Sequence, residues 1–230
     1  MPFQKTLYNQ PAPAVEGDFA SANPRSSTLA GEAALIADPL GLTVGRFAWV
    51  STNLARNFGT GAPAGFVHRE QGVALITAWL GNNTMLIPGG RACTLMNGGD
   101  YWARSLNAAT PGQKAFADLG SGALIAAAAG ATIAAGALTA SQSGTTLTVT
   151  ATTPTLFPGM SLSGANVPAG AYIVSQLTGS AGGTGTYQVS YSATIASQSF
   201  AVAGAAETNF YVRSAALAGE LVKISTHGKP

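Results

Sequence analysis

The clearest pattern of hydrophobic and polar positions lies between residues 139 and 203, where single bulky apolar residues alternate with Ser, Thr and Gly. In residues 145–150, Leu147 and Val149 share one face and the Thr hydroxyls share the other, which predicts a half-buried strand. Further strands are predicted at 160–163, 172–177 and 187–191, and around Ile195 and Phe200, separated by Gly and Pro turns. These short strands predict a small antiparallel β-sandwich.

The flanking sequence also predicts strands, and turn residues such as those of 81–83, 88–90 and 97–100 separate them. The predicted strands are 42–50, 65–69, 73–80, 85–87, 92–96, 101–105, 208–213 and 220–225, with a short helix as the alternative at 71–80. In the last strand, Val222 and Ile224 are expected to face inward and Lys223 to face water. The predicted fold class is all-β.

The first forty residues carry five prolines among scattered apolar side chains. Proline removes a backbone donor and biases the preceding residue toward extended conformations, so residues 1–40 are expected to form an extended arm. Apolar residues on such an arm need a surface to cover them. That surface is either the same chain, with the arm as a strap, or a neighbouring subunit.

Charge divides the chain, because all nine acidic and eleven basic residues lie in 1–118 or 207–230. This step predicts a module inserted into a second domain, with the two ends of the insertion close together. The expected organisation is an N-terminal arm (1–40), a β-barrel-like domain (41–138 plus 204–230) and an inserted β module (139–203).

Composition excludes several classes of protein. Only 9% of residues are charged and the net charge is +2, too little to attract nucleic acid or anionic lipid. Residues 119–140 are uncharged but mostly Ala, Gly and Ser, which does not predict a membrane span. Cys93 is the one cysteine, so no internal disulfide, metal site or other cofactor is expected. The start lacks the apolar core of a secretory signal, which predicts synthesis in a cytoplasm.

Candidate catalytic groups are few. His68 shares a predicted strand face with Glu70, a pair that could do acid-base work but is commonly structural. Cys93 is expected to be a small buried strand residue. The glycine-rich stretches 59–65 and 182–185 lack the flanking strand, helix and Lys of a phosphate loop. Tyr172, Tyr187 and Tyr191 either bind glycans by stacking or, as packing favours, belong to the core.

Several motifs carry a resemblance to a known family. The opening residues 1–6 (MPFQKT), 8–21 (YNQPAPAVEGDFAS) and 23–25 (NPR) are similar to the start of structural cement, or head decoration, proteins of tailed bacteriophages. Shorter supporting matches are 44–49 (VGRFAW), 65–70 (GFVHRE) and 218–224 (AGELVKI). Residues 139–203 resemble the small immunoglobulin-like modules inserted in phage structural proteins, through TLTVT and GGTGTYQVS.

The resemblance implies a tulip-like β-barrel that binds the outer surface of an icosahedral head and stabilises contacts between major capsid protein subunits. It implies a virion protein that is not an enzyme, and an oligomer, expected to be a homotrimer. Residues expected to contact the shell or a neighbouring subunit are Phe3, Tyr8, Pro11, Pro13, Val15, Phe19 and Arg25. The alternative is a glycan-binding or adhesive β protein exposed on the virion, and weak glycan binding by the inserted module remains open within the first interpretation.

Overall fold

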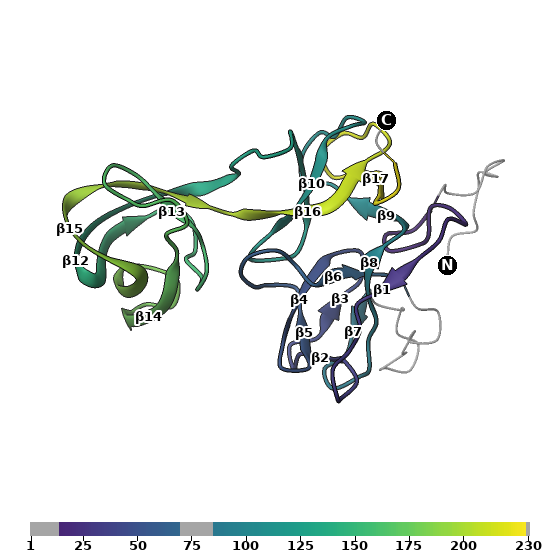
Figure 1. The fold of residues 1–230 in the computed structure, drawn as a ribbon, viewed down its shortest axis with the longest axis horizontal. Coiled ribbons are helices and arrows are strands. Elements are labelled where there is room, and N and C mark those ends of the chain that lie inside the picture. Colours follow the sequence, from purple (N-terminus) through teal and green to yellow (C-terminus); the bar gives the residue numbers. More distant parts are fainter. Residues whose placement is uncertain (1–13, 70–84, 229–230) are drawn as a thin grey trace, which may run out of the picture.

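A computed structural model describes residues 14–69 and 85–228. All regular structure in these residues is β-strand (Figure 1). The predicted all-β class is therefore confirmed. No helix in the described ranges is long and apolar enough to cross a membrane.

The largest sheet has six short strands. In spatial order they are β1 (Ser26–Ser27), β8 (Leu95–Gly98), β6 (Gly65–Val67), β4 (Phe47–Ser51), β5 (Leu54–Arg56) and β2 (Ile36–Ala37). All neighbours are antiparallel except β2 and β5, which are parallel. Separately, β3 (Leu42–Thr43) pairs with β7 (Leu86–Ile87). Both edges of the large sheet thus come from the proline-containing N-terminal region, as expected of a segment short of backbone donors.

A second, antiparallel sheet has five strands. Their order is β11 (Leu124–Ala127), β10 (Lys114–Asp118), β16 (Ala205–Val212), β17 (Leu221–Ser225) and β9 (Asp100–Arg104). Val222 and Ile224 are fully buried and Lys223 is exposed, so the predicted inward and outward faces of β17 are confirmed.

The third sheet lies apart from the other two (Figure 1). It consists of β12 (Ala134–Thr152), β15 (Gly185–Ala203) and β13 (Leu162–Ser163), with β14 (Ile173–Gly179) paired to β15. Leu147 and Val149 are buried and Thr148 and Thr150 exposed, which confirms the predicted alternation. Residues 134–203 are called the distal lobe below, and the remaining described residues the body.

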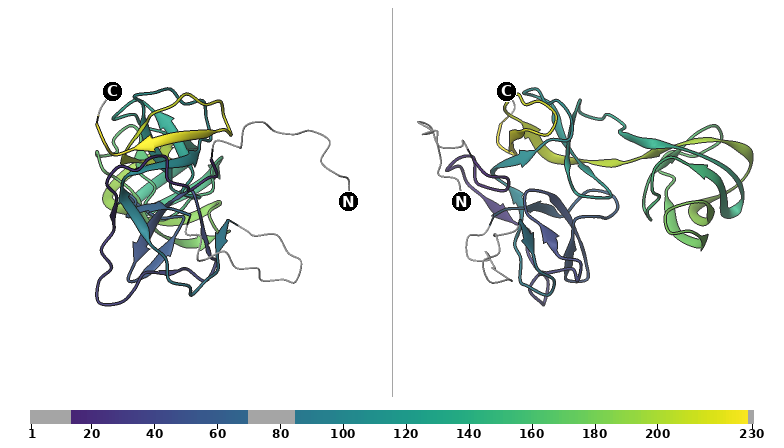
Figure 2. Two further views of the ribbon diagram at one scale, coloured as in Figure 1. Left: turned by 90° about the vertical axis from the view of Figure 1, so that its right-hand side faces the viewer. Right: turned by 180° about the vertical axis from the view of Figure 1, so that it is seen from behind.

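The distal lobe joins the body through two strands. Gly204 alone separates β15 from β16, so one nearly continuous path runs from the lobe into the five-stranded sheet (Figure 2). Leu119 N donates to Gly204 O at 2.8 Å, and Gly204 N donates to Ile133 O at 2.8 Å. The ring of Phe157, in the lobe, also packs against Gly120 of the body, in the space that a side chain at position 120 would occupy. Buried side chains of the lobe and of the five-stranded sheet consequently form one continuous cluster.

The strands that the structure describes form open sheets, and no closed barrel is found among them. The predicted barrel-like domain is instead built from two main sheets. An aromatic cluster, in which Phe66 and Phe210 contact both Phe47 and Tyr101, spans them with ring centroids 5.2–6.3 Å apart. A separate cluster around Leu35, Leu42 and Leu95 fills the six-stranded sheet.

Several predicted strand boundaries were wrong. Residues 42–50 form two strands, because Gly45 turns the chain at φ +78°. In residues 92–96 the strand begins only at Leu95, after an isolated β-bridge between Ala92 and Ile36, which leaves Cys93 outside any strand. The separate strand predicted around Ile195 and Phe200 is part of the uninterrupted β15. Strands β1, β2, β5, β10 and β11 were not predicted, and the predicted element at 71–80 lies outside the described residues.

Candidate functional site

Residues 14–25 lie along the free edge of β9, and we call them the strap. Gly17 N donates to Trp102 O at 2.7 Å, Trp102 N donates to Asp18 O at 2.9 Å, and Phe19 forms a β-bridge with Tyr101. A turn precedes this pairing, closed by Asp18 N donating to Val15 O, and Gly17 there has φ +87°. The described part of the predicted arm therefore lies on its own chain.

Phe19 is the best-held side chain of the strap. Its ring lies 5.2 Å from the His68 ring and 5.5 Å from the Tyr101 ring, and the Arg25 guanidinium stacks 3.9 Å above it. A cation over an aromatic face is attracted by the ring quadrupole. Phe19 is nevertheless 36% exposed and Val15 is 41% exposed. The strap thus presents apolar surface to the outside while its backbone is fixed.

Two ion pairs flank the strap. Arg104 Nε lies 3.3 Å from Glu16 Oε2, and Arg69 Nη1 lies 3.2 Å from Asp18 Oδ1. Both pairs are partly exposed, and such pairs each contribute about 0.2–1 kcal/mol. The two ion pairs therefore fix the position of the strap along β9 and contribute little to the free energy of unfolding.

Asp100 joins the far end of the strap to the C-terminal segment. Its Oδ2 accepts hydrogen bonds from Ser21 Oγ at 2.5 Å and Asn23 Nδ2 at 2.6 Å. His227 Nε2 lies 2.7 Å from Pro24 O, and the Arg213 guanidinium donates to His227 O. Segments from both ends of the sequence are thereby held together beside β9.

Electrostatics favour the charged form of Asp100. Partial burial by itself raises the pKa of Asp100, but polar contacts from Ser21, Ser225 and Asn23 and the nearby His227 outweigh burial and lower it below 3.8. Burial raises the pKa of Tyr101 to about 12, Arg25 opposes this and Asp100 adds to it. The Tyr101 hydroxyl therefore stays neutral and donates to Gly98 O at 2.8 Å. The residues lining a cavity of about 300 Å³ beside Asp100 are Ala20, Ser21, Asn23, Asp100, Arg213, Lys223, Ile224, Ser225 and His227.

The predicted contact residues divide between described and undescribed parts of the chain. Val15, Phe19 and Arg25 lie together on the strap, with Arg25 on the Phe19 ring. Phe3, Tyr8, Pro11 and Pro13 lie outside the described residues. Sequence reasoning missed Glu16, Asp100 and His227. No local pattern identifies them, because each acts on a residue distant in sequence.

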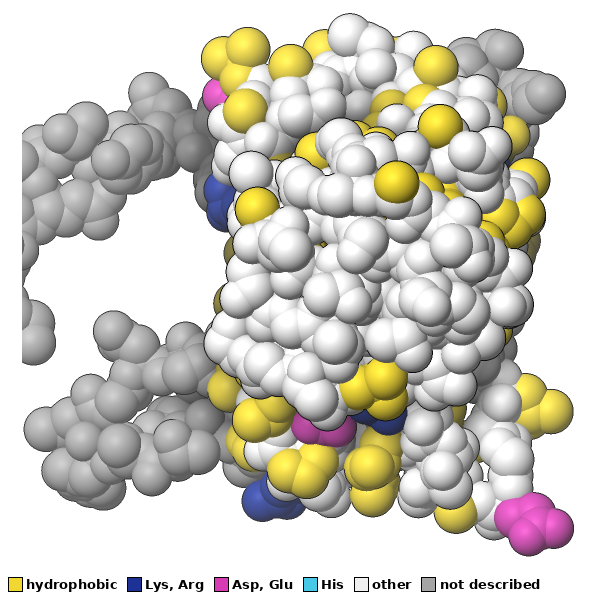
Figure 3. All heavy atoms as spheres, turned by 90° about the vertical axis from the view of Figure 1, so that its left-hand side faces the viewer, with side chains coloured by type: hydrophobic (Ala, Val, Ile, Leu, Met, Phe, Trp, Pro, Cys, Tyr) yellow, Lys and Arg dark blue, Asp and Glu magenta, His cyan; other side chains and the backbone are white. Residues whose placement is uncertain are grey.

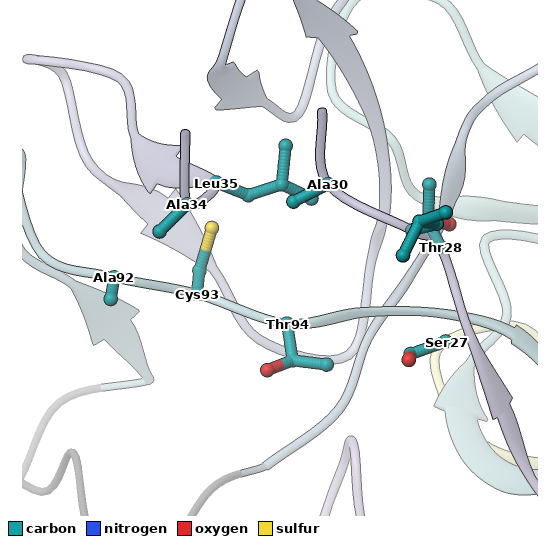
Figure 4. A pocket seen from close by; sticks show the side chains of 9 residues that line it. Ser27, Thr28, Ala30, Ala34, Leu35, Ala92, Cys93 and Thr94 are labelled. Atoms are coloured by element: carbon teal, nitrogen blue, oxygen red, sulfur yellow. The ribbon is translucent and has the colours of Figure 1, made fainter. Parts of the chain in front are cut away.

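Cys93 does not lie in a strand or in the fully buried core, so its prediction was wrong. It lines a pocket of about 390 Å³, and its thiol points toward Ala34 and Leu35 (Figure 4). The other lining residues, Ser27, Thr28, Leu29, Ala30, Ala92 and Thr94, offer neither an imidazole nor a charged group. This pocket supplies no base to activate a nucleophile.

Among the other candidate residues, His68, Tyr187 and Tyr191 pack against neighbouring side chains and Tyr172 is exposed. His68 packs its ring on Phe19, and Glu70 lies outside the described residues. Within 14–69 and 85–228, no group of three metal-ligating side chains is found. Tyr187 is fully buried and Tyr191 is half-buried, which leaves Tyr172, 45% exposed, as the one accessible ring of the three.

These features are those of an all-β protein whose strap presents apolar side chains at the surface. Residues 3–226 match the family model of the XM1 gp53 minor capsid protein, so the chain belongs to that family. Membership confirms the expectation of a phage head component, and a minor capsid family implies a structural, non-enzymatic role.

The structure comparison gave a match to a chain of a solved structure described as the capsid of Myoviridae phage XM1. The alignment covers 100% of both chains with 12% sequence identity and a TM-score of 0.44. No curated protein matches the sequence.

Proposed function

We propose that this protein is a decoration, or cement, protein of the phage head. Many copies bind the outer surface of the icosahedral shell and stabilise contacts between major capsid protein subunits. The observation that carries the proposal is the strap, whose backbone is fixed on β9 while Val15 and Phe19 remain exposed. A contact segment that is ordered before binding loses less conformational entropy when it binds.

Each part of the chain has its own role in this function. Phe3, Tyr8, Pro11 and Pro13 precede the anchored strap and extend its contact with the shell or with a neighbouring copy. Residues 41–138 and 204–230 form the capsid-binding domain, and 139–203 form an inserted module that projects from it. The protein assembles as a homotrimer, because weak contacts repeated by symmetry sum to a stable clamp.

The test is binding to assembled shells that lack this protein. Deleting residues 1–13 while retaining the strap is expected to weaken binding at least tenfold, because it removes four of the seven proposed contact residues without touching the described fold. Co-sedimentation of protein with shells measures occupancy. Leu217→Ala is the matched control, since Leu217 is 68% exposed and far from the strap in sequence.

Unchanged binding by two N-terminal variants would contradict the proposal. If the truncated protein and a Val15→Ser variant both saturate shells at the wild-type concentration, the N-terminal region is not the capsid contact. Heating the shells supplies a second measurement, because a cement protein raises the temperature at which they open.

A glycan-binding function is less well supported by the structure. Stacking on a sugar needs an exposed aromatic face, and Tyr172 is the one ring of the predicted three that is exposed on the lobe surface. A single exposed Tyr is ordinary on a protein surface. Glycan binding therefore enters below as an outcome of an experiment.

A further inference from the structure

The outer strand of the distal lobe exposes a row of apolar side chains. Tyr172, Val174 and Leu177 are 45%, 39% and 53% exposed, while Ile173 between the first two is fully buried. Val174 and Leu177 belong to β14, and Tyr172 directly precedes it. β14 lies at the end of the molecule remote from β1 and β17 (Figure 1).

β14 is also the edge of its sheet. Among the described residues, β15 is the one strand that pairs with it. On its other side, Gly159 N donates to Ile173 O, Ile173 N donates to Met160 O, and Ser161 forms a β-bridge with Tyr172. The free edge therefore begins at Val174. Edge strands leave unpaired N–H and C=O groups that can pair with another chain.

Natural edge strands normally carry devices that prevent such pairing, among them Lys and other charges, Pro and β-bulges. β14 has irregular register on either side of Ser175 and Gln176, but its sequence contains neither a proline nor a charged residue. Residues 119–206 carry no formal charge at all. Viewed from the side of the lobe, the molecule presents mainly uncharged surface, with charged side chains at its margins (Figure 3).

We propose that β14 is a contact between two copies of this chain, in which the two edge strands pair antiparallel about a two-fold axis. This surface offers an edge strand and apolar side chains but no charge, so it fits a partner that is uncharged and offers a strand edge with apolar side chains. β14 of a second copy has both properties. Because the lobe is uncharged, two lobes do not repel each other electrostatically.

This contact deepens the proposed function and rests on it, because copies meet at high local concentration when they cover a shell. A two-fold contact is isologous, so it joins copies of different trimers instead of copies within one trimer. The lobes then link neighbouring decoration units above the capsid surface.

The experiment uses full-length protein with Leu177→Lys, which places two like charges close to each other in the paired edge. Self-association measured by sedimentation velocity is expected to weaken at least tenfold. Leu217→Lys, an equally drastic change at an exposed site on the body, is expected to leave it unchanged. Melting temperatures equal to that of the wild-type protein establish that both variants fold. If Leu177→Lys does not fold, Val174→Lys replaces it.

A second measurement tests the contact on the particle. In a Cys93→Ala background, Leu177→Cys is expected to form disulfide-linked dimers on decorated shells under mild oxidation, and Leu217→Cys is not. Equal self-association of all Lys variants, with no linked dimer, overturns the proposal. If a neutral dextran protects the thiol of the Leu177→Cys variant from alkylation, without self-association, the proposal is overturned in favour of a glycan as the occupant.

Failure of this inference is distinguishable from failure of the proposed function. If the inference alone is wrong, the β14 variants still occupy shells and the lobes remain unlinked. If the proposed function is wrong, even the wild-type protein does not bind shells.

Discussion

At the scale of single residues, Asp100 connects parts of the chain that the sequence keeps far apart. It accepts hydrogen bonds from Ser21 and Asn23 in the strap, and it lies beside Ser225 and His227 at the other end. Since hydrogen bonds to a carboxylate favour the charged form, the strap and the charge of Asp100 depend on each other.

This dependence predicts a specific response to pH. The pKa of Asp100 is lower in the folded protein than its ordinary value of 3.8, so its contribution to stability is complete above pH 3.8 and is lost as the pH falls through the folded value. Protection of the strap amides from hydrogen exchange, measured relative to their intrinsic exchange rates, is expected to fall in that acid range. In Asp100→Asn the exchange is expected to be faster at neutral pH and to lose this acid-dependent step. If exchange of the strap amides depends on pH in the same way in both proteins, Asp100 does not hold the strap.

The sequence predicted some residue positions well and others not at all. Burial of Leu147, Val149, Val222 and Ile224 follows from alternation within one strand, which is a local property. The Phe19 stack on His68 and Tyr101 depends on which strands become neighbours, and hydrophobic pattern does not specify that. Val15 and Phe19 were expected on an extended apolar arm that lies either on its own chain as a strap or on a neighbouring subunit, and the sequence does not predict that β9 is the strand beneath it.

At the scale of elements, the two 19-residue strands of the distal lobe are the main departure from expectation. The sequence predicted shorter strands here, at 145–150, at 187–191 and around Ile195 and Phe200, but β12 and β15 run on without interruption. Between Gly144 and Thr146 the register of β12 shifts against β15 and the buried face passes from Leu138 and Ala140 to Leu147 and Val149. A bulge therefore changes the phase of alternation without ending the strand.

The junction between β15 and β16 requires glycine for steric reasons. A Cβ on Gly204 would lie 2.6 Å from Ala135 Cβ and 2.9 Å from Ala135 Cα, where the outgoing and returning strands cross. Gly204→Val is therefore expected to lower the free energy of unfolding by about 1–3 kcal/mol. Urea denaturation measures it.

The matched control for that substitution is Gly31→Ala. A Cβ on Gly31 meets nothing within 4 Å, so its effect is expected to stay within about 0.5 kcal/mol. Equal midpoints for the two variants would show that the crossing relaxes and that Gly204 is not required there.

At the scale of the whole molecule, the body and the distal lobe differ in charge, but their buried side chains form one continuous cluster. The charge step in the sequence lies close to the strand crossing, with Asp118 ending β10 and Glu207 in β16. What the sequence did not reveal is the number of sheets. Strands of two or three residues, such as β1, β2 and β6, carry too little pattern to identify their neighbours.

This arrangement predicts that the body folds without the distal lobe. Ala134 and Ala203 are paired across β12 and β15, which places their Cα atoms about 5 Å apart, close enough for a two-residue Asn-Gly turn. Replacing residues 135–202 by Asn-Gly is expected to give a folded protein that still binds shells. A single cooperative thermal transition together with shell occupancy checks it. A molten product would mean that Phe157 and its neighbours are needed to complete the core of the body.

The position of β16 has a mechanical consequence. β16 lies in the middle of the five-stranded sheet, bonded to β10 on one side and to β17 on the other, and it continues through Gly204 into β15. Traction that passes from the distal lobe through β15 therefore enters the body lengthwise along a central strand, so that many backbone bonds are sheared together. A tether attached in this way resists buffeting of the lobe far better than one attached at a sheet margin.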